Sequence, residues 1–466
     1  MRNLKRALSL ALATVMTMGL MMVGTGASYK DVNDSQNVEA IEVLQTVGIM
    51  TGDENGNFNP DKTVTRNEMA VIMANLLNLD YDYYRGTNPF TDVPSWAAPY
   101  VAACAAEGVV SGIGNNMYGG EGNVTAAQAS LMIMKALGYF QYQNDFGDDW
   151  QVATIRQASY IDLFSNINAT AETALTRNQI AQLVLNGLKA DMVSFTGDVG
   201  TEATIGDTTI NIGYRAEYTS KTSASAKYNS IVGGKTDIAP QGQYYIQLGE
   251  ELYDGDLKLD NDSTDVFYRP AHTWSYDGEE IGTYVNYDLM VKDYTTAVSG
   301  KDLYDVIGKT AFDKYDFESY VNGEESDLYK EISKNNKQNV SNTADGALTQ
   351  VFVNSDAQTV VVTVVNTYLA KADADYNEKK DEANFIIYDY SVSGSTKTFT
   401  EKRESVSGED FNVADVTEGE FYLVTYADDE IQSISDVEVL SDVEISKISA
   451  SGTMVTAVTV DGTKYD

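Results

Sequence analysis

The feature that most limits the fold of this chain is an internal repeat that ends near residue 190. Three copies of a helix–turn–helix pattern run from Tyr29 to Leu79, from Phe90 to Tyr139, and from about Asp148 to Lys189. In each copy the second helix carries an apolar stripe, which a two-helix unit cannot bury alone. We therefore expect the three units to pack around a pseudo-threefold axis as one helical bundle.

Every second helix begins with the same Thr-x-x-Glu/Gln pattern, which is typical of a capping box. In a capping box the Thr hydroxyl and the Glu or Gln side chain satisfy two backbone N–H groups at the start of the helix. The sequence predicts this structural role for three pairs: Thr65 and Glu68, Thr125 and Gln128, and Thr176 and Gln179.

Two of the three caps are followed directly by an arginine, Arg66 or Arg177, whereas the second repeat has Ala126. A cation in the first turn faces the positive end of the helix dipole, which costs roughly 0.3–1 kcal/mol. Compensation comes from a nearby carboxylate or from an anionic ligand that contacts both the arginine and the helix N-terminus. A role limited to holding the bundle together is the alternative for each arginine.

The repeats also share sequence motifs. The second begins Phe90-Thr91-Asp92-Val93 and continues with Trp96-Ala97, and the first contains Gly56-Asn57-Phe58-Asn59-Pro60 followed by Thr65-Arg66-Asn67-Glu68. With these residues the copies resemble the S-layer homology (SLH) repeats of surface-layer proteins of Firmicute-type bacteria. The resemblance implies that residues 28–80, 88–140 and 146–192 form one helical domain.

The resemblance also implies a ligand: a secondary cell-wall polysaccharide or another peptidoglycan-linked glycan, often acidic or pyruvylated, held in grooves between repeats. By the same resemblance, Arg66 and Arg177 contact its acid groups. Asp31, Asp92 and Trp96 line or support the grooves, with a role only in packing as the alternative. Because repeat two lacks the arginine and repeat three lacks the Gly-x-Phe-x-Pro turn, we expect two functional grooves at most.

Residues 1–27 have the pattern of a secretory signal peptide. Three cations precede the apolar run Ala7–Val23, and small residues end at Ala27, the expected cleavage position. A membrane anchor is the alternative, but the run is shorter than the roughly 20 residues that a spanning helix needs. No later segment is long and apolar enough, so we expect no transmembrane segment after signal removal and a secreted protein of the cell wall or surface layer.

Composition excludes several classes of function. The 69 acidic and 32 basic residues give a formal net charge of −37, which opposes nucleic-acid binding through the general field of the protein. The single Cys104 excludes an intrachain disulfide and is expected to pack inside a helix pair. The single His272 excludes catalysis by paired histidines. No metal ligand is assigned, and weak Ca²⁺ binding by acidic clusters is the one cofactor left open.

From about residue 200 the sequence becomes rich in Thr, Val, Tyr and Asp with period-two alternation, which predicts strands. Residues 204–210 read as a hairpin around Gly206-Asp207, and Val360–Val365 as a strand buried on both faces. We predict an α + β multidomain chain, in which two all-β, sandwich- or barrel-like modules follow the bundle. These are residues 200–345 and 346–466, and the second, which lacks a closing element, is expected to be truncated or to pair with a neighbour.

The densest aromatic stretch runs from Tyr268 to Tyr276. We interpret it as a strand whose alternate aromatic residues fill a core, with sugar stacking or a protein contact as the alternative. For the whole chain we expect a non-catalytic, wall-anchored surface protein whose β region contacts other copies or other surface proteins. The alternatives are a wall-anchored glycan hydrolase, a sugar-binding protein or an adhesin that carries the same anchor. The sequence lacks a Gly-x-Ser-x-Gly motif, but its many carboxylates leave glycoside hydrolysis open.

Overall fold

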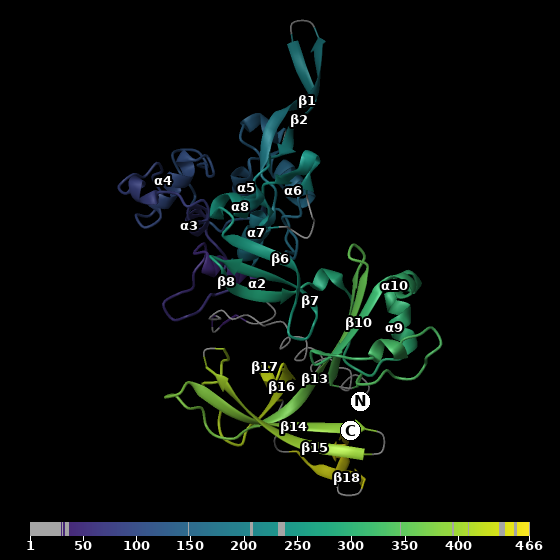
Figure 1. The fold of residues 1–466 in the computed structure, drawn as a ribbon. Helices are drawn as coiled ribbons and strands as arrows, with labels where there is room; N and C mark the ends of the chain where they lie inside the picture. Colours follow the sequence, from purple (N-terminus) through teal and green to yellow (C-terminus); the bar gives the residue numbers. More distant parts are fainter. Residues whose placement is uncertain are drawn as a thin grey trace. The chain divides into compact units, whose positions relative to one another are not determined.

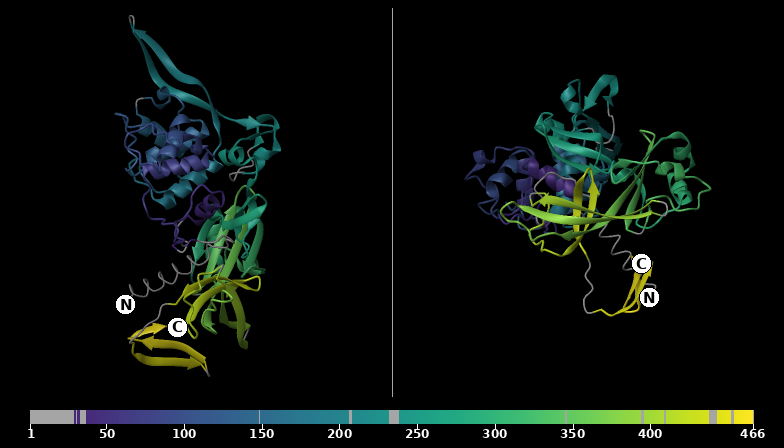
Figure 2. Two further views of the ribbon diagram at one scale, coloured as in Figure 1. Left: turned by 90° about the vertical axis from the view of Figure 1, so that its left-hand side faces the viewer. Right: turned by 60° about the horizontal axis from the view of Figure 1, so that its bottom comes forward.

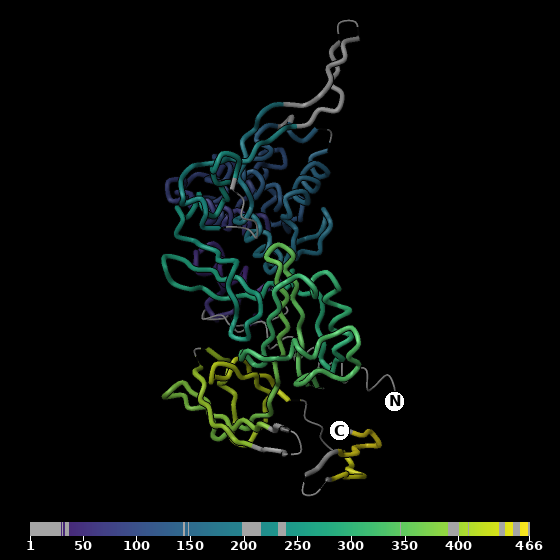
Figure 3. Tube along the Cα trace, turned by 45° about the vertical axis from the view of Figure 1, so that its right-hand side comes forward, coloured from purple at the N-terminus to yellow at the C-terminus, as the bar shows by residue number. Residues whose placement is uncertain are grey.

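The computed structural model describes residues 29, 31–32, 37–147, 149–205, 208–231, 238–344, 346–393, 396–408, 410–437, 443–451 and 454–465. They form two compact units, whose chain path can be followed by colour in Figure 3. The first holds the described residues up to Asp265 together with Pro270–Val285, and the second holds Val266–Arg269 and the residues from Asn286 onward. The predicted signal peptide lies outside the described residues. Among those described, no helix has the length and apolarity to span a membrane.

The first unit begins with the helical bundle, in which each repeat contributes two helices. They are α2 (Val38–Thr46) and α3 (Arg66–Leu76), α4 (Ala98–Ala106) and α5 (Ala126–Leu137), and α6 (Trp150–Tyr160) and α7 (Arg177–Lys189). The apolar stripes face inward, so that Ile41, Met73 and Ile133 are at most 1% exposed. Cys104 on α4 is also buried, and its thiol donates to the carbonyl of Ala70 on α3, as helix packing predicts.

A closed ring of backbone hydrogen bonds joins the three repeats just before their second helices. The amide of Val64 donates to the carbonyl of Leu175 (3.0 Å), that of Leu175 to Val124 (3.2 Å), and that of Val124 to Val64 (2.8 Å). All three side chains are buried. Because the ring closes after three equivalent steps, the predicted pseudo-threefold packing is confirmed.

Strands follow the bundle within the same unit. The hairpin of β1 (Val193–Ile205) and β2 (Thr208–Ser220) extends away from the helices (Figure 2), and Ile205 pairs with Thr208 as the predicted two-residue loop requires. Gly206 and Asp207 themselves lie outside the described residues. The remaining elements are β3 (Thr222–Ser223), β4 (Ile238–Ala239), β5 (Gln243–Tyr245), α8 (Leu248–Tyr253), β6 (Leu257–Thr264), β7 (Pro270–Tyr276) and β8 (Glu279–Val285). The last three strands form one antiparallel sheet in chain order.

The second unit is built on a nine-stranded sheet. Its central strand β13 (Thr359–Ala372) pairs in parallel with β10 and antiparallel with β12 along its first half, then with β14 and β16 along its second half. The other elements are β9 (Met290–Tyr294), α9 (Gly300–Ile307), α10 (Lys309–Lys314), β10 (Asp316–Val321), β11 (Glu324–Glu325), β12 (Ala347–Asn354), β14 (Glu382–Ser393), β15 (Thr396–Ser407), β16 (Phe421–Ala427), β17 (Glu430–Asp436), and a separate sheet of β18 (Ile445–Ser451), β19 (Met454–Val460) and β20 (Thr463–Tyr465).

Helices α9 and α10 cover one face of this sheet (Figure 1), where Leu303 and Ile307 pack with Val351 and Val362. The run Val360–Val365 is buried throughout, as predicted for a strand covered on both faces. Helices α8, α9 and α10 were not expected from the sequence. The expected module boundary at residues 345–346 falls just before β12. Because β12 pairs with β9, this boundary separates strands that belong to one sheet.

The aromatic stretch from Tyr268 to Tyr276 is divided by the fold. Trp274 on β7 is fully buried, as the core interpretation requires, whereas Tyr268 is 45% exposed and stacks on Tyr320 in the second unit. The core interpretation therefore holds for Trp274 and not for Tyr268.

Candidate ligand-binding grooves

Arg66 and Arg177 make the same set of contacts, each with the turn of another repeat. Arg66 donates from Nε to the carbonyl of Tyr118 (3.3 Å) and from Nη2 to that of Ser111 (3.2 Å), with its Cζ 4.6 Å from the centre of the Tyr118 ring. Arg177 donates from Nε to Phe58 (2.6 Å) and from Nη2 to Thr51 (2.7 Å), with its Cζ 4.5 Å from the Phe58 ring.

These contacts give each arginine a structural role, because the guanidinium ties a helix to the neighbouring repeat and gains a cation–π contact. The described residues supply hydrogen-bond partners for Nε and Nη2 of both arginines. For Nη1 of each arginine, the described residues supply no hydrogen-bond partner. Each site is therefore a prearranged cation with unused hydrogen-bonding capacity.

The amides at the start of these helices are already occupied. The amide of Arg66 donates to the carbonyl of Gly122, that of Asn67 to Gly120, and that of Glu68 to the hydroxyl of Thr65. In repeat three the amides of Arg177 and Asn178 bond the carbonyls of Lys62 and Pro60 in the same way. An anion at either groove would consequently meet the arginine side chain rather than the helix N-terminus, which differs from the joint contact considered from sequence.

The two aspartates hold the turn beneath each arginine. The carboxylate of Asp92 accepts from the amides of Tyr118 (2.7 Å) and Gly119 (2.8 Å). Asp31 accepts from Phe58 and Asn59, at 2.7 Å each. The two backbone hydrogen bonds are the main reason that the pKa of Asp92 lies below its usual value. Both aspartates thus position the aromatic ring on which the guanidinium lies.

Trp96 lies just before α4, and its side chain is 53% exposed. None of the contacts recorded for the described residues joins it to Arg66 or Arg177. The structure therefore brings together four of the five predicted groove residues in two pairs, Arg66 with Asp92 and Arg177 with Asp31.

The rims of the two grooves differ chemically, although residues 51–62 and 111–122 align without a gap. Beside Arg66 the turn carries Ile113 and Met117, which are 62% and 40% exposed. The aligned residues beside Arg177 are Asp53 and Asn57. Hydrogen bonds, first of all from the Asn57 amide, lower the pKa of Asp53 to about 2, so this carboxylate is charged at neutral pH.

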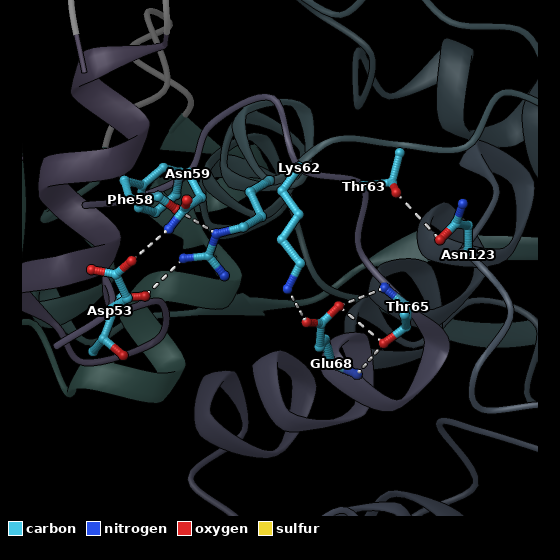
Figure 4. Close-up of polar contacts among 10 residues, drawn as sticks. Asp53, Phe58, Asn59, Lys62, Thr63, Thr65, Glu68 and Asn123 are labelled. Atoms are coloured by element: carbon cyan, nitrogen blue, oxygen red, sulfur yellow. Dashed lines mark hydrogen bonds and ion pairs between the residues drawn. The ribbon is translucent and has the colours of Figure 1, made fainter. Parts of the chain in front are cut away.

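Asp53 organises its own turn rather than a calcium loop. Its carboxylate accepts from the amides of Asn55 (2.9 Å) and Asn57 (3.0 Å) and from the side chain of Asn59 (3.1 Å), as Figure 4 shows for Asn59. Across the described residues, no group of three or more His, Cys, Asp or Glu side chains is arranged to hold a metal ion.

The aromatic partners Phe58 and Tyr118 were not singled out from sequence as groove residues. The gap-free alignment of the two turns would have revealed them, because it places Phe58 and Tyr118 at the same position. In the third equivalent place Ala126 is fully buried, and its amide bonds the carbonyl of Thr173 in a turn without an aromatic residue. In the part of the chain that the structure describes, the arginine–aromatic pair therefore occurs at two of the three equivalent places.

All three predicted capping boxes are present. In each, the Thr hydroxyl accepts from the amide three residues on, and the Glu or Gln side chain accepts from the Thr amide. Figure 4 shows the first, where Glu68 also forms an ion pair of 2.7 Å with Lys62. Burial raises the pKa of Glu68, but the bonds from Lys62 and Thr65 outweigh it and lower the pKa overall.

Comparison with known proteins agrees with the geometry of the repeats. The family model described as the S-layer homology domain matches residues 28–70 and 89–130. The chain is 30% identical over 178 residues to the middle cell wall protein of Brevibacillus brevis, covering 37% of this chain and 16% of that protein. It is 24% identical over 263 residues to the cell surface protein of Thermoanaerobacter kivui, covering 54% of this chain and 33% of that protein.

Enzymes are also among the similar proteins. The chain is 36% identical over 93 residues to endo-1,4-beta-xylanase A of Thermoanaerobacterium saccharolyticum, covering 20% of this chain and 8% of that enzyme. The chain thus spans at most a third of the length of these three relatives. With two repeats matched by the family model, the chain is identified as a cell-wall-associated, extracellular surface protein that contains S-layer homology domains.

Proposed function

We propose that the helical bundle anchors the chain to an anionic wall-linked polysaccharide, and that Arg66 and Arg177 bind its acid groups. The observation that carries the proposal is the repeated arrangement of a guanidinium held on an aromatic ring with Nη1 left for a ligand. Arginine suits carboxylate and phosphate because its planar donors form charge-assisted hydrogen bonds, each worth about 1.5–3 kcal/mol.

The Arg66 groove is the stronger anion site in this proposal. The charges of Glu68, Asp31 and Asp53 all act on Arg177, whereas the residues aligned with them at Arg66 are Gln128, Asp92 and Ile113, of which Asp92 alone is acidic. An anion at Arg177 therefore meets more negative charge. The exposed Ile113 and Met117 also offer the Arg66 groove an apolar rim, which suits a sugar acid that carries a methyl or acyl group.

The remainder of the chain serves a non-catalytic, surface-layer role in this proposal, through contacts with copies of itself or with other surface proteins. Its support is the similarity to proteins named as cell wall and cell surface proteins. A wall-anchored glycan hydrolase is the second candidate, because a xylanase is among the similar proteins. Release of reducing sugar from xylan or wall glycan by the purified chain would establish the enzyme instead.

The anchoring role is tested by sedimentation of the secreted chain, without residues 1–27, with purified cell-wall sacculi. We expect the wild type to pellet and the double variant Arg66→Ala/Arg177→Ala to stay in the supernatant. Arg156→Ala removes an exposed arginine on α6 and is the matched control, which should pellet like the wild type. Because both groove arginines also hold the bundle, circular dichroism must show that the double variant is folded. Equal pelleting of a folded double variant would refute the proposal.

A further inference from the structure

A buried polar cluster joins the first helix of the bundle to the sheet β6–β8 within the first unit. Glu39 and Glu42 lie one turn apart on α2. The Glu39 carboxylate accepts a hydrogen bond from the Trp274 indole (2.7 Å) and lies 2.9 Å from Nε2 of His272, both on β7. Glu42 accepts a hydrogen bond from the hydroxyl of Tyr284 on β8.

The Glu42 side of this cluster is buried: Trp274 is 0% exposed, Glu42 5% and Tyr284 7%. The side chains of Glu39 and of His272, the only histidine of the chain, are 22% and 13% exposed. A buried carboxylate is costly when it is charged and is not matched by a cation. The two glutamates therefore differ in the partner that could offset their negative charge. Glu39 has the basic side chain of His272 within reach, whereas Glu42 has the phenol of Tyr284.

The charges around the two glutamates sharpen this difference. Besides His272, the positive group that acts on Glu39 is Lys189 at the end of α7. Tyr284, the partner of Glu42, is also influenced by Glu39 and by Glu280 on β8, which are both acids. The pKa of Glu42 is set by burial and by the Tyr284 hydrogen bond, and the Tyr284 phenol carries no positive charge that would offset an ionised Glu42.

We propose that this cluster is a proton-controlled interlock, which holds the β6–β8 sheet against the first repeat while Glu42 is protonated and loosens that contact when Glu42 ionises. Such a lock makes the anchor bundle and the following sheet one rigid piece under mildly acidic conditions and frees them from each other above neutral pH. Nothing in the proposed polysaccharide binding is needed for it.

The electrostatics of each glutamate set the pH range. Burial raises the pKa of Glu42 from 4.5 to about 7, against the opposing effect of the Tyr284 hydrogen bond. Its contribution to the closed contact is therefore complete below pH 4.5 and is lost as the pH rises through about 7. Burial also acts to raise the pKa of Glu39, but His272, Lys189 and Trp274 outweigh it and lower the value to about 2. The contribution of Glu39 is thus present above pH 4.5 and is lost only in strong acid.

Hydrogen exchange of the secreted chain, without residues 1–27, tests the interlock. Protection factors, corrected for the intrinsic pH dependence of exchange, are compared at pH 5 and pH 8 for peptides from α2 and β8. In the wild type we expect the protection factors of both peptides to fall by about 70-fold from pH 5 to pH 8, which is the change that the two pKa values of Glu42 imply. In Glu42→Gln, which is neutral at every pH, the fall should be less than about 3-fold.

Two further variants separate the interlock from a general effect of pH. Glu54→Gln removes an exposed carboxyl and should behave like the wild type. Tyr284→Phe removes the bond that favours ionised Glu42, so the transition should move to higher pH, and this readout remains if Glu42→Gln fails to fold. A flat wild-type profile, an equal fall in Glu42→Gln, or an equal fall in α5 peptides would overturn the proposal.

Discussion

At the scale of single residues, the groove arginines have a structural role beside the proposed binding role. Each fixes its own repeat to the next through two carbonyls and an aromatic ring, and in the proposed function Nη1 binds the ligand. The sequence indicated that these arginines needed compensation for facing a helix dipole. It could not indicate that carbonyls would supply much of it, because Ser111 and Thr51 are distant in sequence and are brought close only by the closed ring of repeats.

Cys104 gives a residue-level prediction about the repeat pair that forms the Arg66 groove. Its thiol is fully buried, and burial raises its pKa to about 12, so the reactive thiolate is scarce at pH 8. We expect it to react with a thiol reagent such as 5,5′-dithiobis(2-nitrobenzoate) at least about 1,000-fold more slowly in the native chain than in denaturant. Rapid labelling of the native protein would show that α3 and α4 are not packed as described.

At the scale of elements, features that depend on neighbouring residues were predicted from the sequence, whereas pairings between distant segments were not. The capping boxes and the buried strand Val360–Val365 follow from residues that are neighbours in sequence. By contrast, α9 and α10 have short sequences whose helical state depends on packing against β12 and β13. The parallel pairing of β10 with β13 and the docking of β8 on α2 likewise join segments far apart in the chain, which no local pattern reveals.

The capping boxes carry an element-level prediction. Thr176→Ala removes the acceptor for the Gln179 amide at the start of α7. A lost cap costs about 1 kcal/mol of stability, which chemical denaturation of the first unit would detect. Thr87→Ala, at an exposed position between repeats, should cost under about 0.5 kcal/mol. Equal costs for the two variants would contradict the assignment of the cap.

At the scale of the whole molecule, the net charge of −37 works against the proposed ligand. An anionic polymer approaching such a chain is repelled at long range, whereas the arginine contacts act only at short range. The acidic surface therefore lowers the rate at which the chain encounters the anionic polymer, and the affinity depends on the two arginine sites. It also keeps copies of the chain apart until salt or cations screen the charge.

This balance predicts an unusual dependence on salt. Raising ionic strength from about 0.01 M to 0.15 M shortens the Debye length from roughly 30 Å to 8 Å. We expect the association rate constant for the polymer to rise several-fold over this range, as measured on a biosensor surface that carries the wall polysaccharide. A rate that falls steadily with salt would mean that a positive region steers the polymer, contrary to the net negative charge of the chain.

The most direct measurement is the dissociation constant for released wall polysaccharide of four proteins: the wild type, Arg66→Ala, Arg177→Ala and the control Arg156→Ala. We expect Arg66→Ala to weaken binding by about 10- to 100-fold, the loss expected for a charge-assisted contact. Arg177→Ala should weaken it less, because Asp53 and Asp31 already oppose an anion there. The control should bind like the wild type. Wild-type affinity in a folded Arg66→Ala variant, or an equal loss in Arg156→Ala, would contradict the account.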